Sequence, residues 1–419
     1  MADDGRDQTV DLLIRTGTVA TMEGPQSPRD GTFANDCGLE AGWTVAVKND
    51  RIAWVGPDPE WRGKAKTTLN AKRRLVTPGF VDSHTHLVYG GDRANELKQK
   101  LAGKSYMQIL ADGGGIMSTV RATREATDNE LEEQALDRLR RMVHHGTTTL
   151  EAKSGYGLDT KAELRILGVA PRLFKRTGIP IVSTFLGAHA VPDEFKGRTD
   201  AYVDLVVDEM LPEVHKQEVA RFCDVFVEDG VFTFEHGHRI LTAAKKAGFE
   251  VRLHADELSN TKGAELAAQV GCLSADHLLR ISEEGVQAMA EAGTIATLLP
   301  TVPLTMIQPQ WAPARKLLDA LVPVALASDH NPNNPVLSMG LVGQLGSYAM
   351  GLTPAQAMTA VTWNAACALG VETQVGSLEV GKKANLLLHD CSDLAHWTYA
   401  LGHNSVTHVV LNGKIVPKA

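Results

Sequence analysis

Two histidines separated by one residue, His84 and His86, are the residues best suited to carry chemistry. They follow residues 75–81, a mostly apolar run that predicts a buried strand. Alternate residues of a strand point to the same side, so both imidazoles should face one point in space, as a divalent metal ion requires. The alternative is that one histidine lies on the surface and that the pair arose by chance.

Polar side chains also follow most of the other predicted strands. An isolated histidine in such a position is more often a satisfied structural residue. Several that meet at one end of a sheet are harder to explain in that way, because an unpaired polar cluster costs folding free energy. The segments concerned are 151–157, 187–189, 254–257, 276–277 and 328–331.

Four of these residues offer the ligand types of a catalytic metal site: His84, His86, His254 and Asp329. Three imidazoles and one carboxylate suit zinc, and they also allow iron or manganese. A metal ion bound there would lower the pKa of its bound water toward about 7 and supply hydroxide near neutral pH.

Glu257 and His277 are the predicted catalytic partners of this site. Glu257 lies three residues after His254, within reach of the water, and is expected to act as general base and general acid. His277 is expected to polarise the attacked carbonyl group and to stabilise the developing oxyanion. The alternatives are that Glu257 only hydrogen-bonds a ligand and that His277 only supports the ligands from outside.

Eight predicted strands, most of them separated by helices, indicate an α/β fold with a (β/α)8 TIM-like barrel. A barrel carries its chemistry at the carboxyl ends of its strands, which is where the polar residues collect. The clearest helix is predicted over residues 128–145, with Asp128 as its N-cap and Gly146 just after its end. The strands are predicted at 75–81, 147–151, 181–186, 224–228, 251–254, 271–276, 294–298 and 324–328.

Both ends of the chain are instead rich in short predicted strands, such as 11–19 and 406–411. Strands this short need a common sheet to be stable, so we expect a small β-sandwich domain formed from both chain termini. Two separate β-appendages are the alternative. The expected units are residues 1–73 with 376–419 for the β-sandwich, and 74–375 for the barrel.

The composition is that of an α/β enzyme, with 419 residues, 43% of them apolar and 22% charged. A net charge of −8 provides no basic field for nucleic acid or an anionic membrane surface. The five cysteines form no Cys-x-x-Cys pair, and neither a secretory signal nor a membrane span is evident. We therefore expect a cytoplasmic protein with no nucleic-acid or membrane partner, which acts on a small molecule.

The His-x-His strand, the later histidines and the final Ser-Asp pair resemble the amidohydrolase superfamily, whose members combine a metal-dependent barrel with a β-sandwich built from both chain ends. The most discriminating segment is Glu151-Ala-Lys-Ser-Gly-Tyr156-Gly, because many amidohydrolases share the His-x-His segment. The chain looks most like the hydrolases of histidine degradation that convert 4-imidazolone-5-propanoate to N-formimidoyl-L-glutamate. The other matching segments are 78–86, 89–93, 185–189, 254–257, 275–277 and 328–332.

The resemblance implies a mechanism and a set of substrate contacts. Metal-bound hydroxide would attack the ring carbonyl, while Glu257 moves the proton to the departing nitrogen and Asp329 shares that work. Arg93 and Tyr156 would bind the propanoate carboxylate, a task suited to the fork of a guanidinium group. The remaining substrate-binding residues would be Tyr106 and His189 along the imidazolone ring, with Asn331, Asn333 and Asn334 beside the substrate or product.

The resemblance also bears on metal number and assembly. Many dinuclear amidohydrolases carry a carboxylated lysine at the end of the fourth strand, where this chain has Glu228 and Asp229. We therefore expect one divalent or trivalent metal ion per chain, zinc or iron, with a second ion bridged by Glu228 as the alternative. A homodimer is expected from the resemblance alone.

Two other functions compete with this interpretation. A mononuclear aminohydrolase acting on cytosine, guanine or a triazine ring would share the ligands and Glu257, but would not need Arg93 and Tyr156 as a carboxylate clamp. A non-enzymatic assembly scaffold would have lost its ligands, whereas all four are present here.

Overall fold

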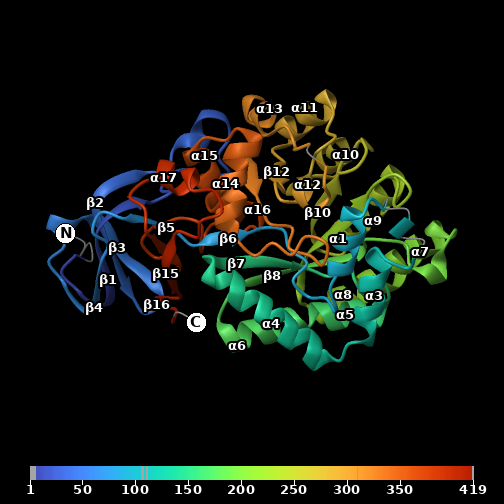
Figure 1. The fold of residues 1–419 in the computed structure, drawn as a ribbon, viewed down its shortest axis with the longest axis horizontal. Helices are drawn as coiled ribbons and strands as arrows, with labels where there is room; N and C mark the ends of the chain where they lie inside the picture. The colour runs from blue at the N-terminus through green and yellow to red at the C-terminus, as the bar shows by residue number, and fades with distance from the viewer. Residues whose placement is uncertain (1–5, 105–107, 110–111, 309, 418–419) are drawn as a thin grey trace.

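The computed structural model describes residues 6–104, 108–109, 112–308 and 310–417. Figure 1 shows two sheets, a barrel surrounded by helices and a separate sheet in which blue N-terminal strands lie beside red C-terminal strands. The predicted barrel with a β-domain from both termini is confirmed. The exact boundaries predicted for the two units, 1–73 with 376–419 and 74–375, stay a prediction.

The barrel consists of eight strands that follow one another around the sheet in chain order, with parallel neighbours. Such parallel strands are buried on both faces, which explains their nearly continuous apolar runs. The strands are β6 (Phe80–Asp82), β7 (Thr147–Lys153), β8 (Ile181–Ala188), β9 (Ala220–Val227), β10 (Glu250–Ala255), β11 (Ser274–His277), β12 (Ile295–Leu298) and β13 (Val324–Leu326).

The barrel closes at the residues that were predicted to carry the chemistry. Beyond the ends of β6 and β13, Thr85 and His330 form an isolated parallel bridge. The Asp329 amide donates to the His84 carbonyl at 3.0 Å, and the His86 amide donates to the His330 carbonyl at 2.8 Å. Backbone hydrogen bonds therefore fix the spacing between the first and last strand ends.

Helices fill most of the connections between the barrel strands. They are α1 (Ala94–Leu101), α3 (Ile116–Glu125), α4 (Asp128–His144), α5 (Thr160–Leu167), α6 (Val169–Thr177), α7 (Thr199–Leu205), the π-helical η4 (Val206–Met210), α8 (Leu211–Gln217), α9 (Phe234–Lys246), α10 (Gly263–Val270), α11 (Glu283–Ala292), α12 (Val302–Thr305), α13 (Ala314–Asp319), α14 (Met339–Met350), α15 (Pro354–Val361) and α16 (Trp363–Ala368). The helix α17 (Leu394–Tyr399) lies between terminal strands, and the short 3-10 turns are η1 (Gly31–Asn35), η2 (Asp58–Glu60) and η3 (Asp193–Phe195).

The start of α4 differs from the prediction by one residue. Thr127, not Asp128, is the N-cap, and it forms a capping box with Glu130. The Thr127 hydroxyl accepts from the Glu130 amide, which places Asp128 in the first turn, where its charge favours the helix dipole. Gly146 follows the helix with φ +98, as the prediction of a C-terminal glycine requires.

The terminal sheet also has eight strands and joins both ends of the chain. Alternate residues of its first strand face different apolar clusters: Leu12 and Ile14 pack in one cluster, and Leu13 between them packs in another. Its strands are β1 (Thr9–Ala20), β2 (Leu39–Lys48), β3 (Arg51–Pro57), β4 (Lys64–Asn70), β5 (Leu75–Pro78), β14 (Leu386–His389), β15 (Val406–Leu411) and β16 (Lys414–Ile415).

The strand predicted over residues 75–81 is two strands, which corrects the prediction. β5 pairs with β1 and β14 in the terminal sheet, whereas β6 belongs to the barrel. The chain changes sheets at Gly79, where a Cβ atom would lie 2.1 Å from Thr148 Oγ1. An apolar run of this kind does not reveal such a change of partner, because both halves are buried.

None of the helices in the described part of the chain has the length and hydrophobicity needed to cross a membrane.

Candidate active site

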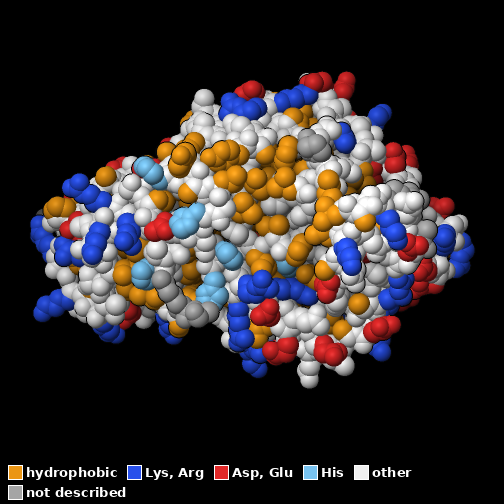
Figure 2. Space-filling model, in the orientation of Figure 1, with side chains coloured by type: hydrophobic (Ala, Val, Ile, Leu, Met, Phe, Trp, Pro, Cys, Tyr) orange, Lys and Arg blue, Asp and Glu red, His pale blue; other side chains and the backbone are white. Residues whose placement is uncertain are grey.

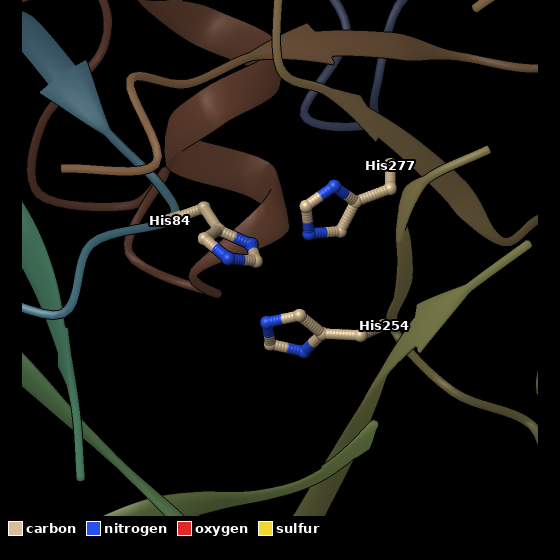
Figure 3. Close-up of side chains that lie close together, drawn as sticks. All are labelled: His84, His254 and His277. Atoms are coloured by element: carbon tan, nitrogen blue, oxygen red, sulfur yellow. The ribbon is translucent and has the colours of Figure 1, made fainter. Parts of the chain in front are cut away.

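The carboxyl ends of the barrel strands bring His84, His254 and His277 together (Figure 3). The ring centroid of His84 lies 4.6 Å from that of His254 and 5.4 Å from that of His277. His86 and Asp329 complete the cluster, since Asp329 Oδ1 lies 3.5 Å from His84 Nε2 and 3.6 Å from His86 Nε2. All five side chains are buried.

The chemistry of the cluster fits a metal ion. Ligand atoms of His84, His254 and His277, and likewise those of His84, His86 and Asp329, lie within 4.8 Å of one another. Several of these atoms are buried without a hydrogen-bond partner, namely His84 Nε2, His254 Nε2, His277 Nδ1 and Asp329 Oδ1. Buried polar atoms are normally satisfied, and converging nitrogen and oxygen atoms of this kind are what zinc and related cations bind.

His277 was predicted to have a catalytic role, and in the structure it also lies among the candidate metal ligands. Its ring is one of the candidate ligand groups, and its Nε2 atom lies 3.6 Å from Glu257 Oε2. The ring therefore lies between the metal cluster and the predicted proton carrier, a position that suits contact with the reacting atoms.

Two aspartates orient the imidazoles of the cluster. The Nδ1 atom of His84 is hydrogen-bonded to Asp276 Oδ2 at 2.6 Å, and that of His254 lies 2.9 Å from Asp224 Oδ2. The Asp276 carboxylate holds a proton at His84 Nδ1 and leaves the lone pair of Nε2 directed at the cluster. Burial lowers the pKa of His84 well below its usual value, which keeps that ring in the neutral form that binds metals.

A network of buried charges lies beneath the cluster and was not predicted from the sequence. Its five members are completely buried: Glu151, Lys153, Asp224, Arg252 and Asp276. The signal that could have revealed it is the presence of charged residues inside otherwise apolar strands. Such charges are rarely buried unless they are paired.

Four residues at the strand ends have left-handed backbone conformations. Asp256 has φ 51, His277 has φ 76, Leu278 has φ 61 and Asp329 has φ 50. Non-glycine residues rarely adopt positive φ, and such strain concentrates at functional sites, where surrounding contacts maintain it. The strained positions coincide with the predicted catalytic segments.

Glu257 lies in the pocket close to the cluster, on the segment after β10. Burial raises the pKa of its carboxyl group to about 8, and the negative charges of Asp329 and Glu228 add to this effect. A carboxyl group with a pKa near neutrality can both accept and donate a proton, which is what a general base that becomes a general acid needs.

Glu228 does not face the cluster. Its carboxylate accepts hydrogen bonds from the amides of Leu258 at 2.8 Å and Ser259 at 3.1 Å, and from the Ser259 hydroxyl. Glu228 therefore anchors the segment that carries Glu257. This use of its carboxylate argues against its acting as a bridge between two metal ions.

The pocket beside the cluster has a volume of about 280 Å³. Arg93, Tyr156, His189, Glu257 and the three predicted asparagines, Asn331, Asn333 and Asn334, all line it. Tyr106, which was also predicted to bind substrate, lies outside the described residues. The pocket is thus small enough to enclose one small-molecule ring and its side chain.

The fork of Arg93 is engaged with a neighbouring carboxylate. Its Nε and Nη2 atoms donate to Glu96 Oε2 at 2.8 and 2.6 Å. The other oxygen of Glu96 accepts from the Gly115 amide at 2.8 Å, so Glu96 ties Arg93 to the start of α3. Two of the three guanidinium nitrogens of Arg93 are therefore engaged with Glu96, and the role of Arg93 in substrate binding stays a prediction.

Tyr156 and His189 form one wall of the pocket. The His189 ring stacks on His86 with centroids 4.9 Å apart, and its Nδ1 atom lies 3.0 Å from the Gly155 carbonyl. Burial lowers the pKa of His189 to about 3, so the ring is neutral and donates from Nδ1 to that carbonyl. Burial raises the pKa of Tyr156 well above its usual value, which keeps its hydroxyl group able to donate.

The predicted asparagines also stabilise their own loop. Asn331 Oδ1 accepts from the amides of Asn333 and Asn334 at 2.8 and 2.9 Å. Asn334 Nδ2 donates to the Ser328 carbonyl at 2.8 Å and to the Asp329 carbonyl at 3.1 Å, whereas its buried Oδ1 has no partner. These contacts position Asp329 and leave Asn334 Oδ1 as an acceptor.

A larger cleft of about 980 Å³ lies elsewhere, between α4 and the C-terminal strands. Its acidic residues are already paired with neighbouring lysines, Asp11 with Lys66 and Asp50 with Lys383. Unlike the strand-end pocket, this cleft brings together no group of candidate metal ligands in the described part of the chain.

Comparison with known proteins agrees with this geometry. The model of the amidohydrolase family matches residues 75–416. The chain belongs to the amidohydrolase family. Amidohydrolases are metal-dependent, in keeping with the cluster of histidines and aspartate at the barrel mouth.

Similar curated amidohydrolases carry the name imidazolonepropionase. The protein of Alkaliphilus metalliredigens is 45% identical over 97% of this chain and 98% of its own length. That of Geobacillus kaustophilus is 47% identical over 91% of this chain and 92% of its own length.

Solved structures with the same fold include two deaminases of lower sequence identity. An adenosine deaminase from Xanthomonas campestris with bound zinc has a TM-score of 0.71 at 20% identity, over 98% of this chain and 93% of its own. A 5-methylcytosine deaminase from Klebsiella pneumoniae has a TM-score of 0.73 at 15% identity, over 97% of this chain and 98% of its own. At this identity the likeness concerns the fold alone.

Proposed function

We propose that this amidohydrolase hydrolyses the cyclic amide of 4-imidazolone-5-propanoate to N-formimidoyl-L-glutamate in histidine degradation. The observation that carries the proposal is the position of Arg93 in the same small pocket as Glu257 and the candidate metal ligands. A substrate with a ring amide and a carboxylate would meet both groups at once. The name shared by the relatives of 41–47% identity supports the same substrate.

One metal ion per chain, zinc or iron, would be held by His84, His86, His254 and Asp329. The unpartnered atoms His84 Nε2, His254 Nε2 and Asp329 Oδ1 support this set, and the engagement of Glu228 with Leu258 and Ser259 supports a single ion. When bound, such a cation supplies Lewis acidity, which lowers the pKa of water and polarises a carbonyl group.

Glu257 would take a proton from the attacking water and deliver it to the departing ring nitrogen. Its pKa of about 8 favours the protonated form, and the positive charge of a nearby cation would shift it toward the carboxylate that a base requires. Asp329 would share this proton work. His277 would donate a hydrogen bond to the carbonyl oxygen as negative charge develops on it.

The walls of the pocket would recognise the rest of the substrate. Arg93 and Tyr156 would bind the propanoate carboxylate, with the Arg93 Nη1 atom available without breaking the pair to Glu96. His189 would stack along the imidazolone ring together with Tyr106. Asn331, Asn333 and Asn334 would close the side of the pocket next to Asp329.

We also propose that the protein forms a homodimer and is located in the cytoplasm. Figure 2 shows a broad apolar area in the upper middle of one face, where Figure 1 places α12, α14 and α15. Leu304 and Tyr348 are 49% and 57% exposed on α12 and α14. Apolar areas of this extent usually mark contact surfaces, so a second copy would be expected to cover this one.

A substrate panel tests the function. Purified protein is incubated with 4-imidazolone-5-propanoate, cytosine, guanine and a triazine, and ultraviolet absorbance and ammonia release are followed. We expect loss of the imidazolone absorbance and no ammonia from the other rings. Ammonia release from a nucleobase, with the imidazolone stable, would instead establish the deaminase function that the fold also allows.

A further inference from the structure

Lys153, near the carboxyl end of β7, is a lysine without any exposed surface. Its Nζ atom lies 2.6 Å from Asp224 Oδ2, 3.1 Å from the Glu151 carboxylate and 3.5 Å from Asp276 Oδ2. The ammonium group donates hydrogen bonds to Asp224 and Glu151 and forms an ion pair with Asp276, so it faces three carboxylates. Burial of such a charge is tolerated only when it is paired in this way.

Two of these carboxylates are the ones that orient the candidate metal ligands. Asp224 lies against His254 Nδ1, and Asp276 accepts the hydrogen bond of His84 Nδ1. A single ammonium group therefore links the supports of two imidazoles that come from opposite parts of the barrel sheet, β6 and β10.

The backbone of Lys153 also contacts the His-x-His segment. Its amide donates to the carbonyl of Thr85, between His84 and His86, at 2.9 Å. The Thr85 hydroxyl in turn donates to the Glu151 carbonyl at 2.6 Å. The backbone of residues 151–153 is thus hydrogen-bonded to the His-x-His segment, and the Lys153 side chain contacts both aspartates.

We propose that Lys153 is the positioning residue that sets the geometry and strength of metal binding at this site, by holding Asp224 and Asp276 in place behind His254 and His84. The proposal depends on the metal site of the proposed function, but not on the identity of the substrate. Lys153 neither lines the pocket nor belongs to the candidate ligand groups, so it acts through the two aspartates.

Arg252 is a second buried cation of the network, and its contacts differ from those of Lys153. Its guanidinium donates to the carbonyls of Ser83 at 2.8 Å and Ala368 at 3.2 Å, and to Asp276 Oδ2 at 3.1 Å. It contacts Asp276 but makes no hydrogen bond or ion pair with Asp224. Arg252 therefore links Asp276 to backbone carbonyls, whereas Lys153 contacts both Asp224 and Asp276.

The test compares Lys153→Met with a second buried lysine, Lys382→Met. Lys382 is 7% exposed and is paired with Ser377 and Glu379 at 2.6 and 2.7 Å; it lies in the chain segment after α16 and does not line the pocket. Both full-length variants lose a buried ammonium group, so both should unfold at lower temperature in the metal-free form. Only a residue that positions the ligands should also alter the bound metal.

The readouts are the Zn²⁺ dissociation constant from chelator competition and the visible spectrum of the Co²⁺-loaded protein. We expect Lys153→Met to weaken Zn²⁺ binding roughly 10- to 100-fold, as losses of such supporting contacts do, and to change the Co²⁺ bands. Lys382→Met should leave both unchanged. A Lys153→Met protein with the wild-type Zn²⁺ constant and Co²⁺ spectrum would overturn the proposal, whatever its melting temperature.

If Lys153→Met does not fold, the same measurements are made on Lys153→Arg. It keeps the charge, but a planar guanidinium group cannot meet the three carboxylates as an ammonium group does. We expect changed Co²⁺ bands and weaker Zn²⁺ binding, and unchanged values would again overturn the proposal. Since neither readout involves substrate, a wild-type protein that binds Zn²⁺ but leaves the imidazolone intact would refute the proposed function and not this inference.

Discussion

The candidate active site has two parts that are built differently. Its floor is the buried framework that holds the candidate ligands, formed by His84, His254, Asp224, Asp276 and Lys153; these residues lie on or just after barrel strands, and each is at most 3% exposed. Its rim, formed by Arg93, Lys100, Asn331 and Asn333, lies on loops and on α1 beyond the strand ends, where the side chains are partly exposed.

The difference indicates that the floor and the rim have separate roles, in reaction chemistry and in substrate selection. Reactive groups need fixed geometry, which strands and paired buried charges provide, whereas substrate selection can be carried by loops that vary without disturbing the barrel. Substitutions in the floor should therefore change metal binding and kcat, and substitutions in the rim should mainly change KM.

The largest effect is expected next to the floor, at Glu257. Glu257→Gln keeps the size of the side chain but removes the proton carrier, so kcat for imidazolone hydrolysis should fall about 10²- to 10⁴-fold with little change in KM. Steady-state kinetics measures this, with Glu235→Gln on the exposed side of α9 as the control. A fully active Glu257→Gln protein would remove Glu257 from the mechanism.

A smaller effect is expected at the rim, at Arg93. A hydrogen bond to a charged group contributes about 1.5–3 kcal/mol, so Arg93→Ala should raise KM roughly 10- to 100-fold while kcat changes little. Glu96→Gln should raise KM less, because it loosens Arg93 without removing it.

The control for Arg93 is Arg121→Ala, an exposed arginine of α3 outside the pocket. If Arg93→Ala lowered kcat and kept the wild-type KM, the assignment of the rim to substrate binding would be wrong.

The smallest effect is expected at Lys100, whose Nζ atom donates to Asn333 Oδ1 at 2.7 Å across the rim. Lys100→Met should change KM by no more than about threefold, since partly exposed contacts of this kind contribute about 1 kcal/mol or less. Lys98→Met on the exposed side of the same helix is the matched control. A loss of metal or a large fall in kcat in Lys100→Met would show that rim and floor are not separable.

The sequence predicted the fold and the cluster because strand alternation and strand ends are local features. His84 and His86 share a face by their spacing, and the barrel order brings His254, His277 and Asp329 to the same end. The change of sheets at Gly79 was missed because β5 and β6 are both fully buried, so their apolar pattern is continuous.

The supporting contacts could not be predicted, because they join residues far apart in the chain. Lys153 and Asp224 are separated by 71 positions, and His84 and Asp276 by 192. The type of a residue shows that it needs a partner but not which one. For the same reason, the pairing of Arg93 with Glu96 and the hydrogen bonds of Asn331 within its own loop appeared only in the structure.

The most direct test of the central claim is an anomalous-scattering experiment on crystals of protein that was never exposed to chelator, with data at the zinc and iron absorption edges. The account predicts one peak per chain, bonded to His84, His86, His254 and Asp329. An empty map, or two peaks bridged by a carboxylate, would contradict it.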